Sequence, residues 1–328
     1  MTLTGPDVHI LQIHPTKRCN LRCLHCYSSS GPRERGELGA PLLLSAVRDA
    51  ASLGYNVLSV SGGEPLLYSK LESVCREAHQ HGMVITLVTN GTVITQRKLD
   101  AMEGLIDLMA ISLDGVPERH NRMRGSKRAF QRMERRLDLV RRARIPFAFV
   151  FTLTQDNLPD LEWAADFAVA QGASMLQVHP IEEYGRACSD LPGQAMSDEQ
   201  TGTAWMVAEC LRDIHRGKLL IHLDTLSRYQ LPVSLDALDD LVSPLVVEDD
   251  GTVVPLRYGF PRAFAFGSLH THTLAELASG WKYRRAAAFD ELCRDTMRKA
   301  RQSDRTFANL YELLSEEAAD RALVAIAT

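Results

Sequence analysis

The chain has 328 residues, of which 45% are hydrophobic and 24% charged, and its formal net charge is −4. This composition is typical of a globular protein and excludes a general attraction to nucleic acid, and no apolar run of about 18 residues and no signal-peptide pattern is present. The seven cysteines are an odd number and four of them lie singly, which argues against a secreted disulfide framework, so we expect a cytoplasmic protein without a membrane or nucleic-acid partner.

A strand followed by a helix is the repeating pattern from residue 8 to about residue 181. We predict six strands, at residues 8–13, 56–61, 84–89, 108–112, 147–154 and 175–180. Between them we predict helices that include residues 41–54, 69–82 and 157–172, the last with Asn157 as its N-cap. Nearly continuous apolar strands alternating with helices favour a parallel sheet buried on both faces. The predicted fold class is therefore α/β, as a partial (β/α)6 barrel.

The pattern changes after about residue 190. We predict a helix over residues 198–216, a strand over 218–226 and a β-hairpin over 243–256, where two apolar runs flank an Asp-Asp-Gly turn. The end of the chain is predicted to be helical. We therefore divide the chain into a barrel of residues 1–190 and a small α+β C-terminal cap of residues 191–328.

Three cysteines, Cys19, Cys23 and Cys26, fall in the loop directly after the first predicted strand. Structural zinc sites usually take four ligands in two close pairs; His14 or His25 could be a fourth ligand, but no matching second cysteine pair lies downstream. A Cys-x2-Cys redox pair would leave Cys19 unused. Three thiolates on a [4Fe–4S] cluster leave one iron open for a small bidentate molecule. The spacing favours the cluster, with zinc and a role without metal as alternatives.

Short polar motifs follow two of the other predicted strands. Gly62, Gly63 and Glu64 come after the second strand, and Ser112 and Asp114 come at the end of the fourth. Because the C-terminal ends of parallel strands meet at one mouth of a β/α barrel, we expect these motifs to face the cysteine loop. The glycines permit close backbone approach, the Glu64 carboxylate suits an ammonium group, and Ser112 and Asp114 suit a ribose diol or a carboxylate. Each motif alone also fits an ordinary turn or helix start.

The Cys-x3-Cys-x2-Cys loop and the Gly-Gly-Glu-Pro motif, in this order and spacing, resemble the radical S-adenosylmethionine (radical SAM) superfamily from residue 8 to about residue 190. The resemblance implies one [4Fe–4S] cluster on Cys19, Cys23 and Cys26, whose open iron binds the amine and carboxylate of SAM. It also implies an enzyme that cleaves SAM reductively and uses the 5′-deoxyadenosyl radical to abstract hydrogen from a substrate.

The same resemblance assigns residues to the parts of SAM. It implies that the amine lies at Gly62, Gly63 and Glu64, the ribose or carboxylate at Ser112 and Asp114, the adenine near His25 and the carboxylate at Arg124. Cys188 lies near the predicted mouth and is a candidate hydrogen-atom donor, although single thiols are commonly just small packing groups.

A Ser-Leu-Asp-Gly motif at 112–115 resembles the branch with pyrroloquinoline-peptide, heme d1 and sulfatase-maturation enzymes. These usually carry a C-terminal SPASM or twitch extension that holds auxiliary clusters. The predicted hairpin resembles that extension, but Leu256 stands where its first cysteine is expected and Cys293 is the only thiol after residue 210. We therefore expect a single cluster. The branch implies modification of a peptide in natural-product or cofactor maturation, with tetrapyrrole side-chain modification or a non-catalytic iron–sulfur or metal-binding protein as alternatives.

The sequence says less about binding partners than about cofactors. The predicted helix at 126–146 carries eight Lys or Arg residues against Glu134 and Asp138, which predicts either a solvated face or a dock for a flavodoxin-like or ferredoxin-like electron donor. About seven residues precede the first strand, so we expect that a peptide substrate would be recognised directly or through a separate protein. His270 and His272 are expected to be ordinary exposed or hydrogen-bonded residues.

Overall fold

The computed structural model describes residues 7–231 and 241–327. All six predicted strands form, as β1 (Ile10–Ile13), β2 (Val57–Val60), β3 (Val84–Thr89), β4 (Leu108–Leu113), β5 (Phe147–Leu153) and β6 (Met175–Pro180). They pair in parallel and in chain order. Their apolar side chains are buried on both faces, with Phe149 and Phe151 of β5 among the largest fully buried ones. This confirms the α/β fold with a parallel sheet.

The sheet continues at both edges into the C-terminal part of the chain. β7 (Leu220–Leu223) pairs in parallel with β6, and β9 (Leu245–Val247) pairs in parallel with β1. β10 (Thr252–Pro255) returns antiparallel to β9 and completes the predicted hairpin, and β11 (Gly267–Ser268) lies beyond it. The result is one ten-stranded sheet in the order β11-β10-β9-β1-β2-β3-β4-β5-β6-β7. The sheet therefore runs across residue 190.

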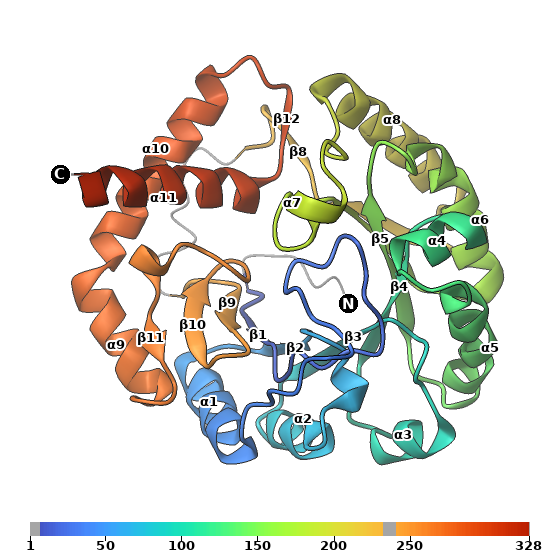
Figure 1. Cartoon of the computed structure of the whole chain (residues 1–328), viewed down its shortest axis with the longest axis horizontal. Coiled ribbons are helices and arrows are strands. Elements are labelled where there is room, and N and C mark those ends of the chain that lie inside the picture. Colours follow the sequence, from blue (N-terminus) through green and yellow to red (C-terminus); the bar gives the residue numbers. More distant parts are fainter. Residues whose placement is uncertain (1–6, 232–240, 328) are drawn as a thin grey trace.

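Helices cover the outer side of this curved sheet, and the loop after β1 lies inside the curve (Figure 1). The covering helices are α1 (Ala40–Leu53), α2 (Leu71–Gln80), α3 (Gln96–Ala101), α4 (Pro117–Met123), α5 (Ala129–Arg142), α6 (Leu161–Gln171) and α8 (Asp198–Ile214). In α1, residues Leu43, Ala46, Val47 and Ala50 are buried at the spacing of one helix face, and Gly54 ends the helix with a φ of 106°. The short α7 (Ala187–Asp190) lies on the inner side.

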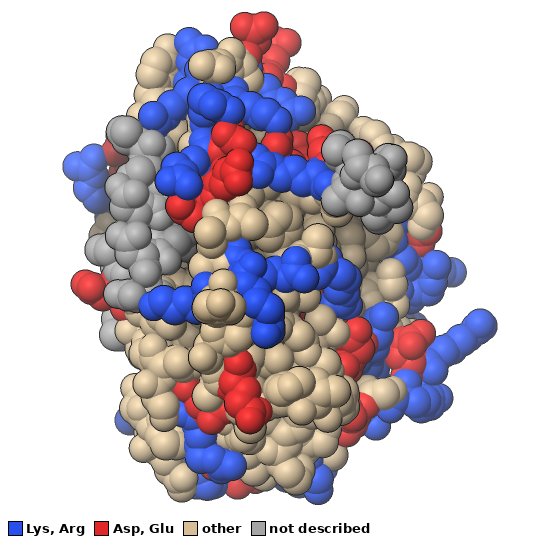
Figure 2. All heavy atoms as spheres, turned by 90° about the vertical axis from the view of Figure 1, so that its left-hand side faces the viewer, with Lys and Arg blue, Asp and Glu red and all other residues tan. Residues whose placement is uncertain are grey.

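The C-terminal cap packs three further helices against the β9–β11 edge. They are α9 (Leu274–Arg284), α10 (Ala286–Gln302) and α11 (Leu310–Ala327), with a small sheet of β8 (Leu226–Ser227) and β12 (Phe307–Ala308) beside them. Trp281 stacks on Phe266 with ring centroids 4.3 Å apart and donates a hydrogen bond of 2.9 Å to the carbonyl of Phe264. Figure 2 shows acidic and basic side chains interspersed on this face. In the described residues, every helix is too short or too polar to span a bilayer.

One predicted helix differs from the structure at its start. The helix expected at 157–172 begins as a 3-10 turn (Leu158–Asp160) that contains Pro159, and the α-helix starts only at Leu161. Asn157 is therefore not its N-cap: its side chain donates to the carbonyls of Asp114 and Thr152 and joins the ends of β4 and β5.

Candidate functional site

The loop between β1 and α1, residues 14–39 (the cysteine loop), brings the three predicted cluster ligands together. Cys19 and Cys23 are buried beside Leu21 and the first residue of α5, Ala129, and Cys26 packs against this group. All three are free thiols. Their side chains therefore form one sulfur-rich group inside the curve of the sheet.

Backbone hydrogen bonds fix the loop in this shape. Cys19 donates to the carbonyl of Gly31 at 3.2 Å, and Leu24 donates to the carbonyl of Met123 at 2.9 Å. Arg186, just before α7, donates to the carbonyl of Cys23 at 2.9 Å. Sequence reasoning missed this arginine, since nothing but its place after β6 marks it.

Burial favours the protonated thiol at Cys19 and at Cys23 while no metal is bound. Burial raises the pKa of Cys19 to about 12, and the nearby Glu64 carboxylate acts in the same direction. Burial also raises the pKa of Cys23, whereas the Arg124 guanidinium opposes that rise. Because iron binds thiolates, loading the site would release protons.

The donor set of the cysteine loop is compatible with a cluster. Among the described residues, no three His, Cys, Asp or Glu side chains are placed to hold one metal ion. A [4Fe–4S] cluster takes one thiolate on each of several irons, so it does not need such convergence. Hydrogen-bond donors also approach the sulfurs: Asn90 Nδ2 lies 3.8 Å from Cys19 Sγ and an Arg124 nitrogen lies 3.7 Å from Cys23 Sγ. The donor set therefore fits three cluster thiolates.

The glycine motif after β2 packs directly on the cysteine loop. Gly63 donates to the carbonyl of Thr16 at 2.8 Å, and Glu64 donates to the carbonyl of Arg18 at 3.0 Å. A Cβ at Gly63 would overlap the Arg18 carbonyl oxygen, and Gly62 has a φ of 108°. Because an ammonium group only donates hydrogen bonds, it would need oxygen acceptors on this segment, such as its backbone carbonyls.

The Glu64 side chain is fully buried and already bonded. It accepts hydrogen bonds from Thr89 Oγ1 at 2.7 Å, from the Asn90 backbone N–H at 2.9 Å and from that of Leu66 at 3.2 Å. The carboxylate therefore ties the end of β2 to the end of β3, beside Cys19. Its predicted contact with an amine would have to add to these three bonds.

Asp114, after β4, is the centre of a buried charge cluster. Arg124 donates to both carboxylate oxygens, from Nε at 2.6 Å and from a terminal nitrogen at 2.9 Å. His25 Nε2 lies 3.3 Å from Oδ1, and His120 Nδ1 accepts from the Asp114 backbone N–H at 3.2 Å. Although burial disfavours the charge, Arg124 and His25 hold the pKa of Asp114 well below its usual range.

The residues predicted to contact SAM thus lie close to the cysteines, but several of them already use their polar groups in hydrogen bonds within the protein. Asp114 and Arg124 satisfy one another, Arg124 reaches Cys23, and Ser112 donates to the carbonyl of Thr89 at 3.3 Å. Sequence reasoning missed His120, whose burial has no local signal. Cys188 lies in α7, is exposed, and donates to the carbonyl of Glu183 at 3.0 Å.

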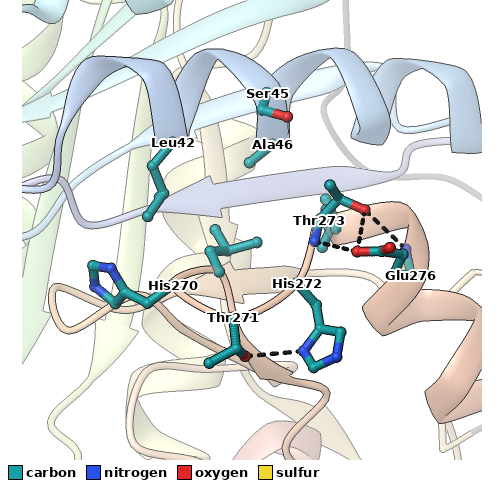
Figure 3. A pocket seen from close by; sticks show the side chains of 10 residues that line it. Leu42, Ser45, Ala46, His270, Thr271, His272, Thr273 and Glu276 are labelled. Atoms are coloured by element: carbon teal, nitrogen blue, oxygen red, sulfur yellow. Dashed lines mark hydrogen bonds between the residues drawn. The ribbon is translucent and has the colours of Figure 1, made fainter.

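One cavity lies away from the cysteine loop, and a second one borders it. One of about 250 Å³ opens between α1 and residues 269–276, where His270 and His272 line it and Thr273 pairs with Glu276 at the start of α9 (Figure 3). It shares no residue with the cysteine loop, so it is not the candidate site. A second, of about 30 Å³, is lined by Asp114 and Leu24 among others and has room for about one water molecule.

Known proteins are similar to this chain over the segment that contains these residues. Residues 13–168 match the Radical SAM superfamily model. The chain is 30% identical over 207 residues to a PqqA peptide cyclase of Ruegeria pomeroyi, covering 62% of this chain and 55% of that one. It is 30% identical over 174 residues to an AdoMet-dependent heme synthase of Methanosarcina barkeri, covering 52% and 50%. The chain therefore spans about half the length of the curated relatives it matches.

Solved structures share the fold. AdoMet-bound anSMEcpe superimposes with a TM-score of 0.67 at 19% identity, over 96% of this chain and 98% of that one. Streptococcus suis SuiB bound to its precursor peptide SuiA gives a TM-score of 0.61 at 14% identity, over 76% and 59%. At these identities the likeness concerns the fold.

Proposed function

Because the chain carries a radical SAM superfamily domain over residues 13–168, we propose that it is a radical SAM enzyme with a single cluster. This family binds a [4Fe–4S] cluster and SAM. We assign Cys19, Cys23 and Cys26 as the ligands, because they are free, packed together and approached by the donors of Asn90 and Arg124. When bound, the cluster and SAM would supply the chemistry that removes a hydrogen atom from an unactivated carbon of the substrate.

The chain's own residues hold and shield this site. Gly62 and Gly63 let the turn after β2 lie against the cysteine loop, and Glu64 fixes that turn to β3. We propose that carbonyl oxygens of 62–64 bind the SAM amine. Asp114 and Arg124 orient the residue before the last cysteine, His25, which we propose packs near adenine, and Ser112 lies at the same strand end.

We retain the division at residue 190 as a proposal about roles. Residues 1–190 would hold the cofactors, and residues 191–328 would complete the sheet and close the site. One cluster is proposed because Leu256 occupies the position expected for an auxiliary cysteine and Cys293 is buried in α10. Cys188 stays a proposed hydrogen-atom donor, since it lies on the same segment as Arg186, which bonds the cysteine loop.

A peptide is the proposed substrate class. A relative is described as a PqqA peptide cyclase and SuiB is solved with a precursor peptide. Tetrapyrrole modification is the second candidate, because another relative is described as an AdoMet-dependent heme synthase.

The test is product release under reducing conditions. The anaerobically reconstituted protein is incubated with SAM, with and without dithionite, and 5′-deoxyadenosine is measured by chromatography. We expect release over multiple turnovers that requires dithionite. Protein that carries about four irons per chain and releases no 5′-deoxyadenosine would instead be the non-catalytic iron–sulfur protein.

The electron donor is proposed to dock at the start of α5. Ala129, the first residue of α5, contacts the buried cysteines, and the exposed Lys127, Arg128 and Arg132 surround it. Basic residues at a helix N-terminus oppose the helix dipole, and the first turn of α5 has no acidic residue. The basic residues at the start of α5 would have a role if an acidic flavodoxin-like or ferredoxin-like protein binds here.

Charge reversal tests the dock. In Arg128→Glu/Arg132→Glu we expect reduction by flavodoxin at low salt to slow by about tenfold or more, because opposite charges steer association. Reduction by dithionite should be unchanged. Arg142→Glu, at the other end of α5, is the control; equal slowing in both variants would refute the dock.

A further inference from the structure

A second polar group lies at the ends of β6 and β7, outside the cysteine site. His179 Nδ1 is 3.0 Å from Asp224 Oδ2, and His179 Nε2 is 3.4 Å from Glu182 Oε1. His222 Nε2 is 3.0 Å from Asp224 Oδ1, and Gln177 donates to Asp224 Oδ2 at 2.8 Å. These five side chains form what we call the edge cluster.

Arg257 joins the edge cluster from the cap, directly after Leu256. One terminal nitrogen lies 2.8 Å from Glu182 Oε2, and the guanidinium lies over the Tyr184 ring at 5.3 Å from its centroid. The arginine side chain is only 12% exposed. Its Nε is buried and has no hydrogen-bond partner among the described residues. Since buried donors are nearly always paired, this nitrogen marks the place of an acceptor that residues 7–231 and 241–327 do not provide.

The position is next to the cysteine loop. The neighbour of Arg257 in sequence, Tyr258, packs on the Tyr27 ring with centroids 5.5 Å apart. A Cβ at Gly185 would lie 2.6 Å from the Cys26 carbonyl oxygen, so the segment that carries Tyr184 also touches the cysteine loop. Arg257 therefore lies on the inner side of the sheet, between the cap and the proposed cofactor site.

The local charges indicate what kind of group would bind. Burial lowers the pKa of His179, but hydrogen bonds to Asp224 and Glu182 prevail and raise it to about 10, so the imidazole is protonated near neutral pH. The cations His179 and Arg257 then face the anions Asp224 and Glu182, and the carboxyl group of Glu312 lies near them. A carboxylate can accept a charge-assisted hydrogen bond from the Arg257 guanidinium, and it adds one negative charge to this group where a phosphate dianion would add two.

We propose that Arg257 binds a carboxylate of the substrate, so that the substrate class is acidic. The proposal rests on the proposed function and adds the group that holds the substrate beside the cofactors. A carboxylate has two sources among the proposed substrates: an acidic residue of a peptide or a propionate of a tetrapyrrole. An arginine at the barrel mouth would fix either by a charge-assisted hydrogen bond.

Equilibrium binding separates this proposal from turnover. The probes are iron coproporphyrin III and its tetramethyl ester, followed by absorption, and a fluorescent Glu-containing peptide and its Gln counterpart, followed by anisotropy. The reconstituted wild-type protein should bind at least one acid form about tenfold or more tightly than its neutral counterpart. Which pair shows the difference identifies the source of the carboxylate.

Variants distinguish binding from structural support. Arg257→Gln should lose the preference for the acid form, while Arg294→Gln, an exposed arginine of α10, should keep it. Glu182→Gln removes the partner of Arg257 but leaves the guanidinium, so it should also keep the preference. Equal loss in Arg257→Gln and Glu182→Gln, or no preference for an acid form in the wild type, would overturn the proposal. Absence of 5′-deoxyadenosine release would instead count against the proposed function and leave these binding results standing.

Discussion

Replacement of Cys23 by alanine is expected to remove both the iron and the activity of the protein. Cys23 is buried among the other thiols and faces the Arg124 guanidinium. Without it only two thiolates remain for a cluster that is held by at least three, and Arg124 loses the negative sulfur beside it. We expect the iron content to fall from about four per chain to near zero, and 5′-deoxyadenosine release to fall at least about a hundredfold.

Cys210→Ala provides the matched control for this change. Cys210 is an exposed free thiol in α8, so its removal should leave iron content and activity unchanged. Both variants should retain the circular dichroism of the wild type. If Cys23→Ala kept its iron and its activity, the ligand assignment would be wrong.

A methyl group at Gly63 is expected to disrupt the site from outside the cysteines. The added Cβ would lie 2.8 Å from the Arg18 carbonyl carbon and 2.9 Å from that of Lys17, and it would overlap the Arg18 carbonyl oxygen. These are backbone atoms, which cannot rotate away as a side chain can. The turn and the cysteine loop must separate, which breaks the hydrogen bonds from Gly63 to Thr16 and from Glu64 to Arg18.

We expect Gly63→Ala to lose about 2–4 kcal/mol of unfolding free energy, as two backbone hydrogen bonds and a close contact are lost. Cluster retention, measured as iron per chain after gel filtration, should fall with it. Gly36→Ala is the control in the same loop, because a Cβ there meets nothing within 4 Å. Equal stability and iron content in the two variants would show that the close approach of the turn and the loop is not needed.

The barrel core could be predicted from the sequence because each of its strands is marked by residues that are neighbours in the chain. Buried parallel strands such as β4 and β5 are short apolar runs, and the Asp-Gly pair directly after β4 marks where that strand stops. Since such strands end at one mouth, the motifs at 62–64 and 112–114 could be expected near the cysteines. The hairpin of β9 and β10 was visible for a similar reason, the Asp-Asp-Gly turn between two apolar runs.

Contacts between distant segments could not be predicted in this way. The parallel pairing of β9 with β1 joins residues such as Leu11 and Leu245, and neither strand carries a signal for its partner. The same holds for the approach of Arg257 to Glu182. Residue type alone also did not show that Asp114 would form a buried ion pair with Arg124. A carboxylate directly after a strand is equally well placed to bind a ligand.

The account depends most on three thiolates holding an iron–sulfur cluster with one iron open to SAM. Electron paramagnetic resonance of the anaerobically reconstituted, dithionite-reduced protein, recorded with and without SAM, tests this directly. We predict the signal of one reduced [4Fe–4S] cluster per chain and a change in its g values when SAM is added. Zinc in place of iron, or a cluster signal that SAM leaves unchanged, would contradict the account.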